Sequence, residues 1–331
     1  MENNYQNELA DLSDLGMSVE ELFAHCDNSE AEAEKITAPR YSYWKSVFRV
    51  FFRKKINIVI LVLLAVVVLF AYIYPMIFPY NAYENLAHMT TTSHLSPAKA
   101  IKTLGFKLKW ILGTGAQGQS TFDAVWNGAR ISISLALICA AINMTVGVVV
   151  GAIWGFSKKV DIVMTEVNNI IGNVPYILVI SVMVMIFTGS FWTLVFAMTI
   201  TGWIGIAYFI RTQVIIIRDR EYNLASKCLG TSTFRIAMRN ILPFMTSVIV
   251  TLLATELPSY ISYEVFFTYL GIGLQEDVTL GRMISQASSN LAVRAWAFEF
   301  WSPTAIAAII TVVLYVVGQN LGDASDPRTH R

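Results

Sequence analysis

The amino-acid sequence predicts an all-α integral membrane protein with six transmembrane helices. The chain of 331 residues is 55% hydrophobic and only 14% charged, a composition too apolar for an ordinary soluble domain. Long uncharged runs also recur along it, and about 20 apolar residues in a helix are enough to cross a hydrocarbon core roughly 30 Å thick. Because lipid offers backbone groups no hydrogen-bond partner, each run is expected to be a helix.

Six apolar runs give the predicted spans. They cover residues 56–78, 131–156, 167–187, 191–210, 243–274 and 300–322. The fifth run is the least clean, since Glu256 and Glu264 interrupt it.

The sequence divides into three predicted regions. Residues 1–34 contain ten Asp and Glu residues and no Lys or Arg, and so polar a stretch buries too little apolar surface to order itself. Residues 35–55 form a basic segment next to the membrane, and residues 56–331 form the transmembrane domain. Within that domain, residues 79–128 make a long polar loop, expected outside the cell as a small cap or a docking surface.

The basic residues indicate the orientation, because Lys and Arg concentrate in cytoplasmic loops. With the N-terminus inside, external segments hold six of them: Lys99, Lys102, Lys107, Lys109, Arg282 and Arg294. Cytoplasmic segments then hold sixteen. Both termini are therefore expected in the cytoplasm, together with the loop at residues 218–242.

This 218–242 loop has the pattern of a short helix, a turn and a second short helix. Small and apolar residues recur on one face of the first helix: Tyr222, Ala225, Ser226 and Leu229. Gly230 is expected to end that helix, because glycine tolerates the left-handed conformation of a helix stop. Thr231 or Ser232 is expected to cap the second helix, and Pro243 suits the first turn of the fifth membrane helix.

The loop resembles the EAA loop of binding-protein-dependent ABC import permeases, in which a Glu-Ala-Ala triplet precedes a glycine and a later Leu-Pro pair. Here the triplet reads Leu224-Ala225-Ser226, the glycine is Gly230 and the pair is Leu242-Pro243. The glutamate that family members set against a basic group of the ATPase is absent, and Glu221 is the candidate for its place. The resemblance assigns ATPase coupling to these residues: Glu221, Tyr222, Leu224, Ala225, Ser226, Gly230, Leu242 and Pro243.

The resemblance extends from about residue 40 to 331, and it is to the C-type subunits of oligopeptide and dipeptide importers (OppC/DppC-like, including the AmiD type of Gram-positive bacteria). The matching segments are 51–55, 112–114, 127–130, 269–273 with Glu264 ahead of it, and 323–328. One departure is residues 115–120, where the family has acidic residues and a Gly-Arg-Asp sequence.

That resemblance implies a type I ABC importer permease fold with a cytoplasmic coupling helix, in a bacterial cell membrane. The implied partners are a second homologous permease subunit, two cytoplasmic ABC ATPase subunits and an extracellular peptide-binding lipoprotein. The chain itself would bind no cofactor, and ATP and Mg²⁺ would be held by the ATPase subunits. We expect an oligopeptide transporter subunit and not an enzyme. Dipeptides or nickel are alternative cargoes, and an ATP-independent secondary transporter is an alternative class.

A search for nucleotide-binding motifs also indicates that this chain does not hydrolyse ATP itself. Residues 113–118 fit the GxGxxG dinucleotide pattern, but they follow no predicted strand and lie in the external loop, so we reject that interpretation. The sequence contains no GxxxxGK[ST] phosphate loop, which means that ATP would be hydrolysed by another chain.

Polar residues inside the apolar runs are candidates for the translocation path, because placing them in lipid is costly. They are Glu166, Asn169, Asn173, Glu256 and Glu264. The same residues suit interhelical hydrogen bonds or interfacial positions, and the sequence leaves these alternatives open. Glycines 147, 151 and 155 suit either close helix packing or gating.

Overall fold

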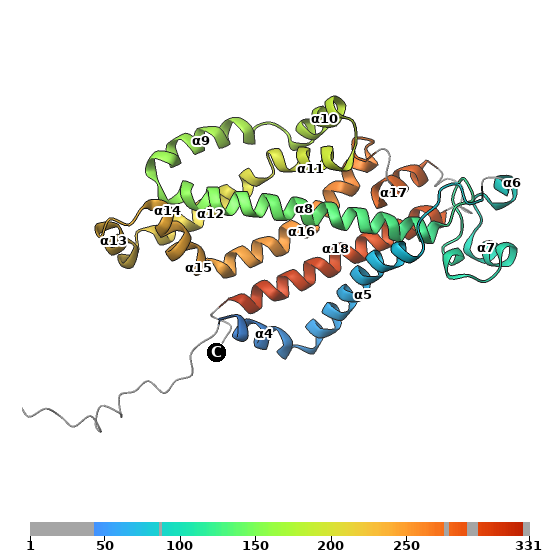
Figure 1. Cartoon of the computed structure of the whole chain (residues 1–331), viewed down its shortest axis with the longest axis horizontal. Coiled ribbons are helices and arrows are strands. Elements are labelled where there is room, and N and C mark those ends of the chain that lie inside the picture. The colour runs from blue at the N-terminus through green and yellow to red at the C-terminus, as the bar shows by residue number, and fades with distance from the viewer. Residues whose placement is uncertain (1–42, 86–87, 275–277, 290–296, 327–331) are drawn as a thin grey trace, which may run out of the picture. The chain divides into compact units, whose positions relative to one another are not determined.

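Among the residues that the structure describes, six helical spans, four continuous and two bent, make up the membrane part of the computed structural model (Figure 1). The continuous spans are α5 (Lys55–Ile77), α8 (Thr121–Phe156), α11 (Phe191–Ile200) joined to α12 (Trp203–Arg218), and α18 (Ala297–Ser325). The bent spans are α9 (Lys158–Gly172) with α10 (Tyr176–Phe187), and residues 233–244 with α16 (Thr246–Tyr269). The predicted all-α fold with six spans is confirmed when each bent pair counts as one span.

The structure describes residues 43–85, 88–274, 278–289 and 297–326. All of these except Tyr43 belong to one unit, Trp44–Arg331. The acidic head predicted for residues 1–34, residues 35–42 of the basic segment and the final residues 327–331 lie outside the described residues.

Both bends have a local cause in the chain. Between α9 and α10 the direction changes by 74°, where Pro175 has an extended backbone (φ −58°, ψ 124°) and cannot continue the preceding helix. The second bend is 75° and falls at Met245. Pro243 therefore lies in the short helix α15 (Leu242–Phe244) ahead of the bend, and the expectation that it opens the long membrane helix is wrong.

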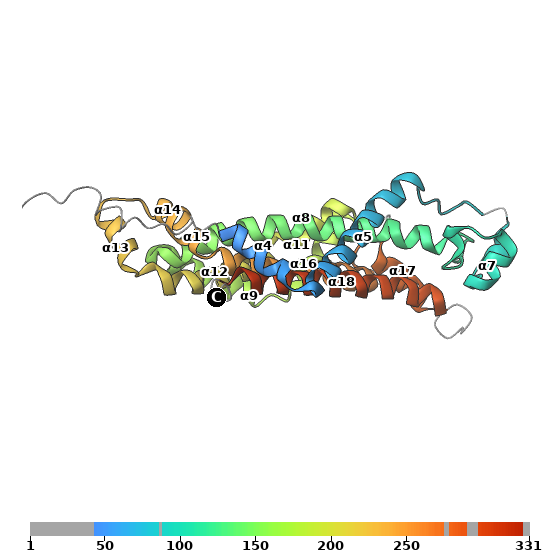
Figure 2. The same cartoon turned by 90° about the horizontal axis from the view of Figure 1, so that it is seen from below.

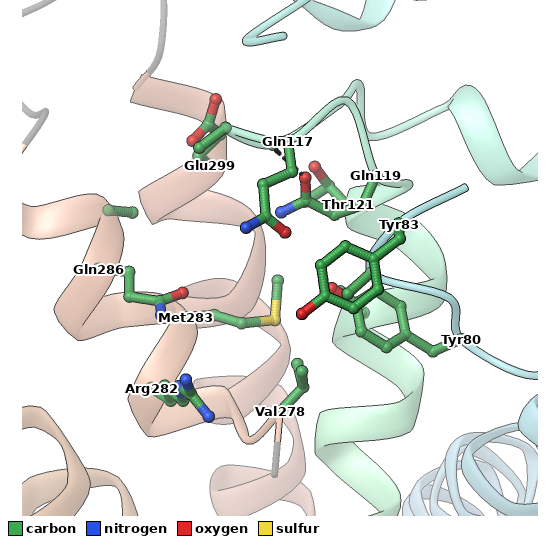
Figure 3. Close-up of a pocket in the computed structure, with 15 residues that line it drawn as sticks. Tyr80, Tyr83, Gln117, Gln119, Thr121, Val278, Arg282, Met283, Gln286 and Glu299 are labelled. Carbon is green, nitrogen blue, oxygen red and sulfur yellow. Dashed lines mark hydrogen bonds between the residues drawn. The ribbon is translucent and has the colours of Figure 1, made fainter. Parts of the chain in front are cut away.

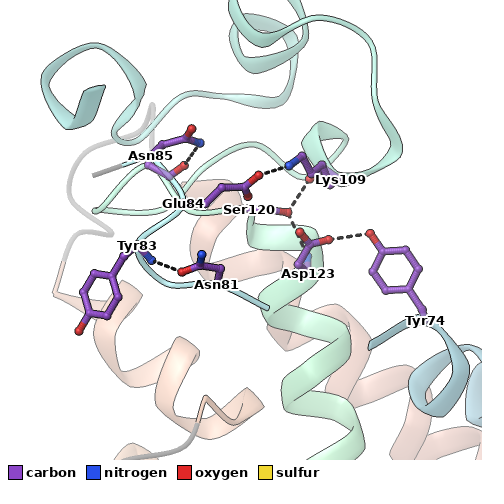
Figure 4. Close-up of polar contacts among 9 residues, drawn as sticks. Tyr74, Asn81, Tyr83, Glu84, Asn85, Lys109, Ser120 and Asp123 are labelled. Carbon is purple, nitrogen blue, oxygen red and sulfur yellow. Dashed lines mark hydrogen bonds and ion pairs between the residues drawn. The ribbon is translucent and has the colours of Figure 1, made fainter. Parts of the chain in front are cut away.

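Helix α8 starts ten residues earlier than its uncharged run, at Thr121 instead of residue 131. The Ser120 hydroxyl caps it by accepting a hydrogen bond from the Asp123 amide at 3.1 Å. Asp123 is buried, and the Tyr74 hydroxyl donates to its carboxylate at 2.6 Å (Figure 4). Residues 121–128, expected in the external loop, are thus helical, since the helix continues through Asp123 and Arg130, the two charges that interrupt the apolar pattern.

Glycines bring α8 close to α12. A Cβ atom added to Gly151 would lie 2.5 Å from the Ala207 carbonyl oxygen, and one added to Gly147 would lie 2.6 Å from the Ile206 side chain. These contacts leave no room for a side chain, so the glycine stripe is a packing face between two helices.

Two opposite ends of the helices carry the remaining elements (Figure 2). One end holds α13 (Glu221–Cys228) and α14 (Thr233–Ile236) of the 218–242 loop. The other end holds α6 (Met89–Thr92), α7 (Pro97–Leu104) and the turn Leu108–Trp110, all within the 79–120 segment. Helix α17 (Leu280–Ser288) packs between α16 and α18, and α4 (Tyr43–Arg53) precedes α5.

Candidate functional site

The 218–242 loop has the predicted helix, glycine stop and second helix. Ser232 lies at the N-cap of the second helix but makes no side-chain capping hydrogen bond, so the capping prediction is wrong. Gly230 follows α13 with φ +78°. Its amide donates to the Lys227 carbonyl at 3.0 Å, and the Thr231 amide donates to the Ser226 carbonyl at 3.1 Å. This pair of bonds is a Schellman motif, which satisfies the last carbonyls of α13 and reverses the chain.

The tip of this loop is apolar and exposed. Leu229 is 86% exposed, and Tyr222, Leu224 and Phe234 are also exposed large hydrophobic residues. Glu221 lies in the first turn of α13 with an exposed side chain, and Ala225 is exposed as well. Exposed apolar side chains gathered in this way are typical of a surface that contacts another protein or a membrane.

Two asparagines, which the sequence analysis passed over, hold α13 in place. Asn223 is buried, and its amide nitrogen donates to the Ile217 carbonyl at the end of α12, at 3.1 Å. Asn240 lies in the π-helical turn Ala237–Ile241 and donates to the Asn223 side-chain oxygen at 3.3 Å and to the Ser226 hydroxyl at 3.2 Å. The sequence feature that could have indicated this role is the position of Asn223, a polar residue on the side of α13 opposite its exposed apolar face.

A second cluster joins the neighbouring helix ends. The Asp161 carboxylate, in the first turn of α9, accepts from the Arg211 guanidinium of α12 at 2.5 Å and from the Trp154 ring nitrogen of α8 at 2.9 Å. Arg211 also lies 5.6 Å from the Trp154 ring centre. The cluster ties α8, α9 and α12 into one block from which α13 projects.

The five residues proposed for the translocation path do not form one site. Glu166, Asn169 and Asn173 are exposed along α9, while Glu256 and Glu264 belong to α16. Within the described part of the chain, no hydrogen bond joins the first three to the last two.

Glu264 is fully buried and hydrogen-bonded. It accepts from the Ser132 hydroxyl of α8 at 2.6 Å and from the Thr268 hydroxyl at 3.1 Å. This is the interhelical bonding that the sequence left open as one alternative. Glu256 is half-buried on α16. A place in the path stays a prediction for all five residues.

A pocket of about 430 Å³ lies at the opposite end of the helices, and the sequence analysis did not foresee it (Figure 3). Its lining includes Tyr80 and Tyr83, Gln117 and Gln119 of the glycine-rich stretch, and Arg282 and Gln286 of α17. The start of α8 and Glu299 of α18 complete it. We call it the Gln117 pocket. Burial raises the pKa of the Tyr80 phenol, so this hydroxyl remains a neutral hydrogen-bonding group.

The glycine-rich stretch at 113–118 has a structural role in this pocket. Gly113 and Gly118 have φ of +78° and +75°, and a bridge pairs Thr114 with Ser120. Several side chains fix the surrounding segment: Lys109 pairs with Glu84, Asn85 donates to the Gly118 carbonyl at 2.9 Å, and Ser120 donates to the Lys109 carbonyl at 2.8 Å (Figure 4). The turn shapes a pocket wall and opens no βαβ unit, as expected for a chance match to the dinucleotide pattern.

A buried contact also ties this segment to α18. The His94 ring nitrogen Nδ1 lies 2.6 Å from a carboxylate oxygen of Glu299, which lines the Gln117 pocket. No group of His, Cys, Asp and Glu side chains with metal-site geometry occurs in the ranges that the structure describes.

The chain is similar to known transport proteins along most of its length. A family model described as the binding-protein-dependent transport system inner membrane component matches residues 147–331, and the N-terminal TM domain of oligopeptide transport permease C matches residues 42–97. The chain is 44% identical to the oligopeptide transport system permease protein AmiD of Streptococcus pneumoniae, covering 94% of this chain and 98% of that protein.

Two further relatives come from Bacillus subtilis. The oligopeptide transport system permease protein OppC is 32% identical, with 94% of this chain and 98% of that protein covered. The dipeptide transport system permease protein DppC is 28% identical, with 94% of each chain covered. The chain therefore belongs to the inner membrane components of binding-protein-dependent transport systems, as an OppC/DppC-like permease subunit of an ABC importer, and is not an enzyme.

Proposed function

We propose that this chain forms half of the translocation pathway of an oligopeptide importer, and that α13 couples it to a cytoplasmic ATPase subunit. The observation that carries the proposal is the mounting of α13. Its tip is apolar and exposed, and Gly230 reverses the chain behind it. Asn223 and Asn240 fix it to the end of α12 and to the π-helical turn Ala237–Ile241. A short helix mounted in this way fits a groove on a partner and moves as a rigid body with it.

Family membership implies an assembly with further permease, ATPase and substrate-binding components. In the arrangement we propose, a second homologous permease completes the pathway and two ATPase subunits hold ATP and Mg²⁺. An extracellular peptide-binding lipoprotein docks over the 79–120 segment and the Gln117 pocket. Both termini lie in the cytoplasm, a placement that Lys158, Lys159 and Arg218 at the α13 end support through the preference of basic residues for that side.

Oligopeptides are the cargo we favour within the family. AmiD and OppC, at 44% and 32% identity, carry that substrate class in their names, and the dipeptide permease DppC is 28% identical. The assembled importer in proteoliposomes should accumulate a labelled oligopeptide when ATP is supplied. Preferential accumulation of a dipeptide or of nickel would select an alternative cargo, and accumulation by the purified chain alone would select a secondary transporter.

Coupling through α13 is tested by cross-linking. The natural Cys228 is exposed on the same helix, so Cys26, Cys139 and Cys228 are first replaced by serine. Ala225→Cys then presents a single thiol on the exposed face of α13, and Ala116→Cys presents an exposed thiol in the 79–120 segment as the matched control. A short thiol-directed cross-linker should join Ala225→Cys, and not Ala116→Cys, to an ATPase subunit. If neither position captures an ATPase in an assembly that hydrolyses ATP, the coupling role of α13 is wrong.

A further inference from the structure

A second pocket, of about 280 Å³, lies beside α13, where the end of α8, the start of α9 and the end of α12 meet. Its lining contains four basic side chains, Lys158, Lys159, Arg218 and Lys227, against one acidic side chain, Asp219. We call it the basic pocket. A concave site with this excess of positive charge is suited to a phosphate-bearing ligand.

Arg218 gives the basic pocket a fixed wall. Its guanidinium donates to the Gly155 carbonyl at 2.8 Å, and its side chain is 17% exposed. The Asp219 carboxylate lies 3.5 Å from the same guanidinium but is 75% exposed, so water screens much of its charge. Asp161 in the first turn of α9 is already engaged by Arg211.

The three lysines contribute charge that the chain does not neutralise. Within the described ranges, none of Lys158, Lys159 and Lys227 forms an ion pair. Lys158 and Lys159 also open α9, a helix of 15 residues whose N-terminal end carries a partial positive charge. The charges therefore add at the mouth of one cavity.

The surface next to this mouth favours a lipid over a free anion. Ile162 and Val163 follow the two lysines by one helical turn and are 71% and 62% exposed. A phospholipid whose phosphate lies among the lysines would lay its acyl chains along these apolar side chains. Basic pockets on the cytoplasmic side of membrane helices are suited to anionic headgroups.

We propose that the basic pocket binds the headgroup of an anionic glycerophospholipid from the cytoplasmic leaflet. A phosphate bound there bridges the start of α9 and Lys227 of α13, and so fastens the coupling helix to the membrane surface. That effect on coupling, and the choice of leaflet, rest on the proposed function. Binding itself does not, and it is measured separately.

The test uses the assembled importer in nanodiscs that contain phosphatidylglycerol carrying a photoreactive group near the start of its acyl chain. Illumination should label peptides that contain Ile162 and Val163. Unlabelled phosphatidylglycerol should compete, whereas phosphatidylcholine and soluble glycerol phosphate should not. Since each lysine near an anionic surface contributes about a fivefold change in affinity, Lys158→Gln with Lys159→Gln should weaken labelling by on the order of 30-fold.

Matched variants separate the pocket from general charge. Lys54→Gln with Lys55→Gln removes two basic residues at the start of α5, outside the basic pocket, and should leave labelling unchanged. Lys158→Arg with Lys159→Arg keeps the charge and should retain labelling, which controls for misfolding.

Three results would overturn the proposal. Equal labelling of the Lys158→Gln, Lys159→Gln variant excludes the pocket, and equal competition by glycerol phosphate makes it a free-anion site. If the same variant loses its ATPase subunits while lipid labelling is unchanged, the two lysines contact a protein subunit and not a lipid. If labelling behaves as proposed but ATP hydrolysis does not respond to phosphatidylglycerol, the site stands and its link to coupling fails.

Discussion

The turn at Gly230 allows a graded test of how α13, the proposed coupling helix, is held. Gly230 has φ +78°, and a Cβ atom added there meets no atom within 4 Å. A substitution is therefore disfavoured by backbone conformation alone, and not by a clash. Asparagine tolerates this conformation, alanine should cost about 1 kcal/mol, and a β-branched valine about 2–3 kcal/mol.

These free-energy costs lower the fraction of molecules in which the chain turns at residue 230. A penalty of about 2 kcal/mol disfavours the turn by roughly 30-fold, while the membrane spans and their packing are untouched. Uptake of labelled peptide and peptide-stimulated ATP hydrolysis should therefore fall in the order Gly230→Asn, Gly230→Ala, Gly230→Val. Membrane insertion of the chain should stay constant across the series.

Gly271 provides the matched control. It has φ +77°, its added Cβ also meets no atom within 4 Å, and it follows α16 at the opposite end of the helices. Gly271→Val carries the same backbone penalty without touching the coupling loop, so ATPase association should survive it. Full uptake by Gly230→Val, or a series without the expected order, would refute the reasoning.

Three further predictions concern the supports of this loop and of the helices. Asn223→Ala removes the buried side chain that holds α13 and should lower the free energy of unfolding by about 1–3 kcal/mol. The ATPase subunits should then dissociate from the purified complex, and their stable association would show that α13 does not depend on Asn223. Glu264→Gln should keep hydrogen bonds to Ser132 and transport peptides normally, while Glu264→Ala should lower the unfolding temperature; the reverse pattern would indicate a charge needed in the path. Gly151→Val should prevent folding, because its side chain has no room against α12, whereas Gly205→Val on an open surface should not; equal yields would contradict the packing of α8 on α12.

The spans differ in how far their bounds follow from local sequence. The 56–78 run and α5 at Lys55–Ile77 agree almost to the residue, because no tertiary contact is needed to keep an uncharged segment in lipid. Helix α8 starts ten residues before the uncharged run, because Asp123 and Arg130 interrupt the apolar pattern although both lie within the helix. A carboxylate suits the first turn of a helix, and the buried hydrogen bond that Asp123 accepts comes from Tyr74, 49 residues earlier in the chain.

The 218–242 loop likewise has one feature that follows from local sequence and one that depends on tertiary contacts. The stop of α13 was predictable, since the left-handed conformation favours glycine wherever it occurs. The anchor was not predictable, because Asn223 and Asn240 are 17 residues apart and meet only after the chain has turned at Gly230. The sequence identifies Glu264 as a carboxylate that is costly to place in a membrane. Its partner Ser132 lies on a different span, so the order of residues does not show what Glu264 contacts.

By itself the sequence determined which segments enter the membrane, how the loops are distributed and where α13 stops, because these depend on local composition and on the conformational freedom of single residues. The tertiary structure alone decided what anchors α13 and how the Gln117 pocket and the basic pocket are assembled. Each of these sites joins residues from separate helices, and their distances are set by helix packing, which no local pattern in the chain records.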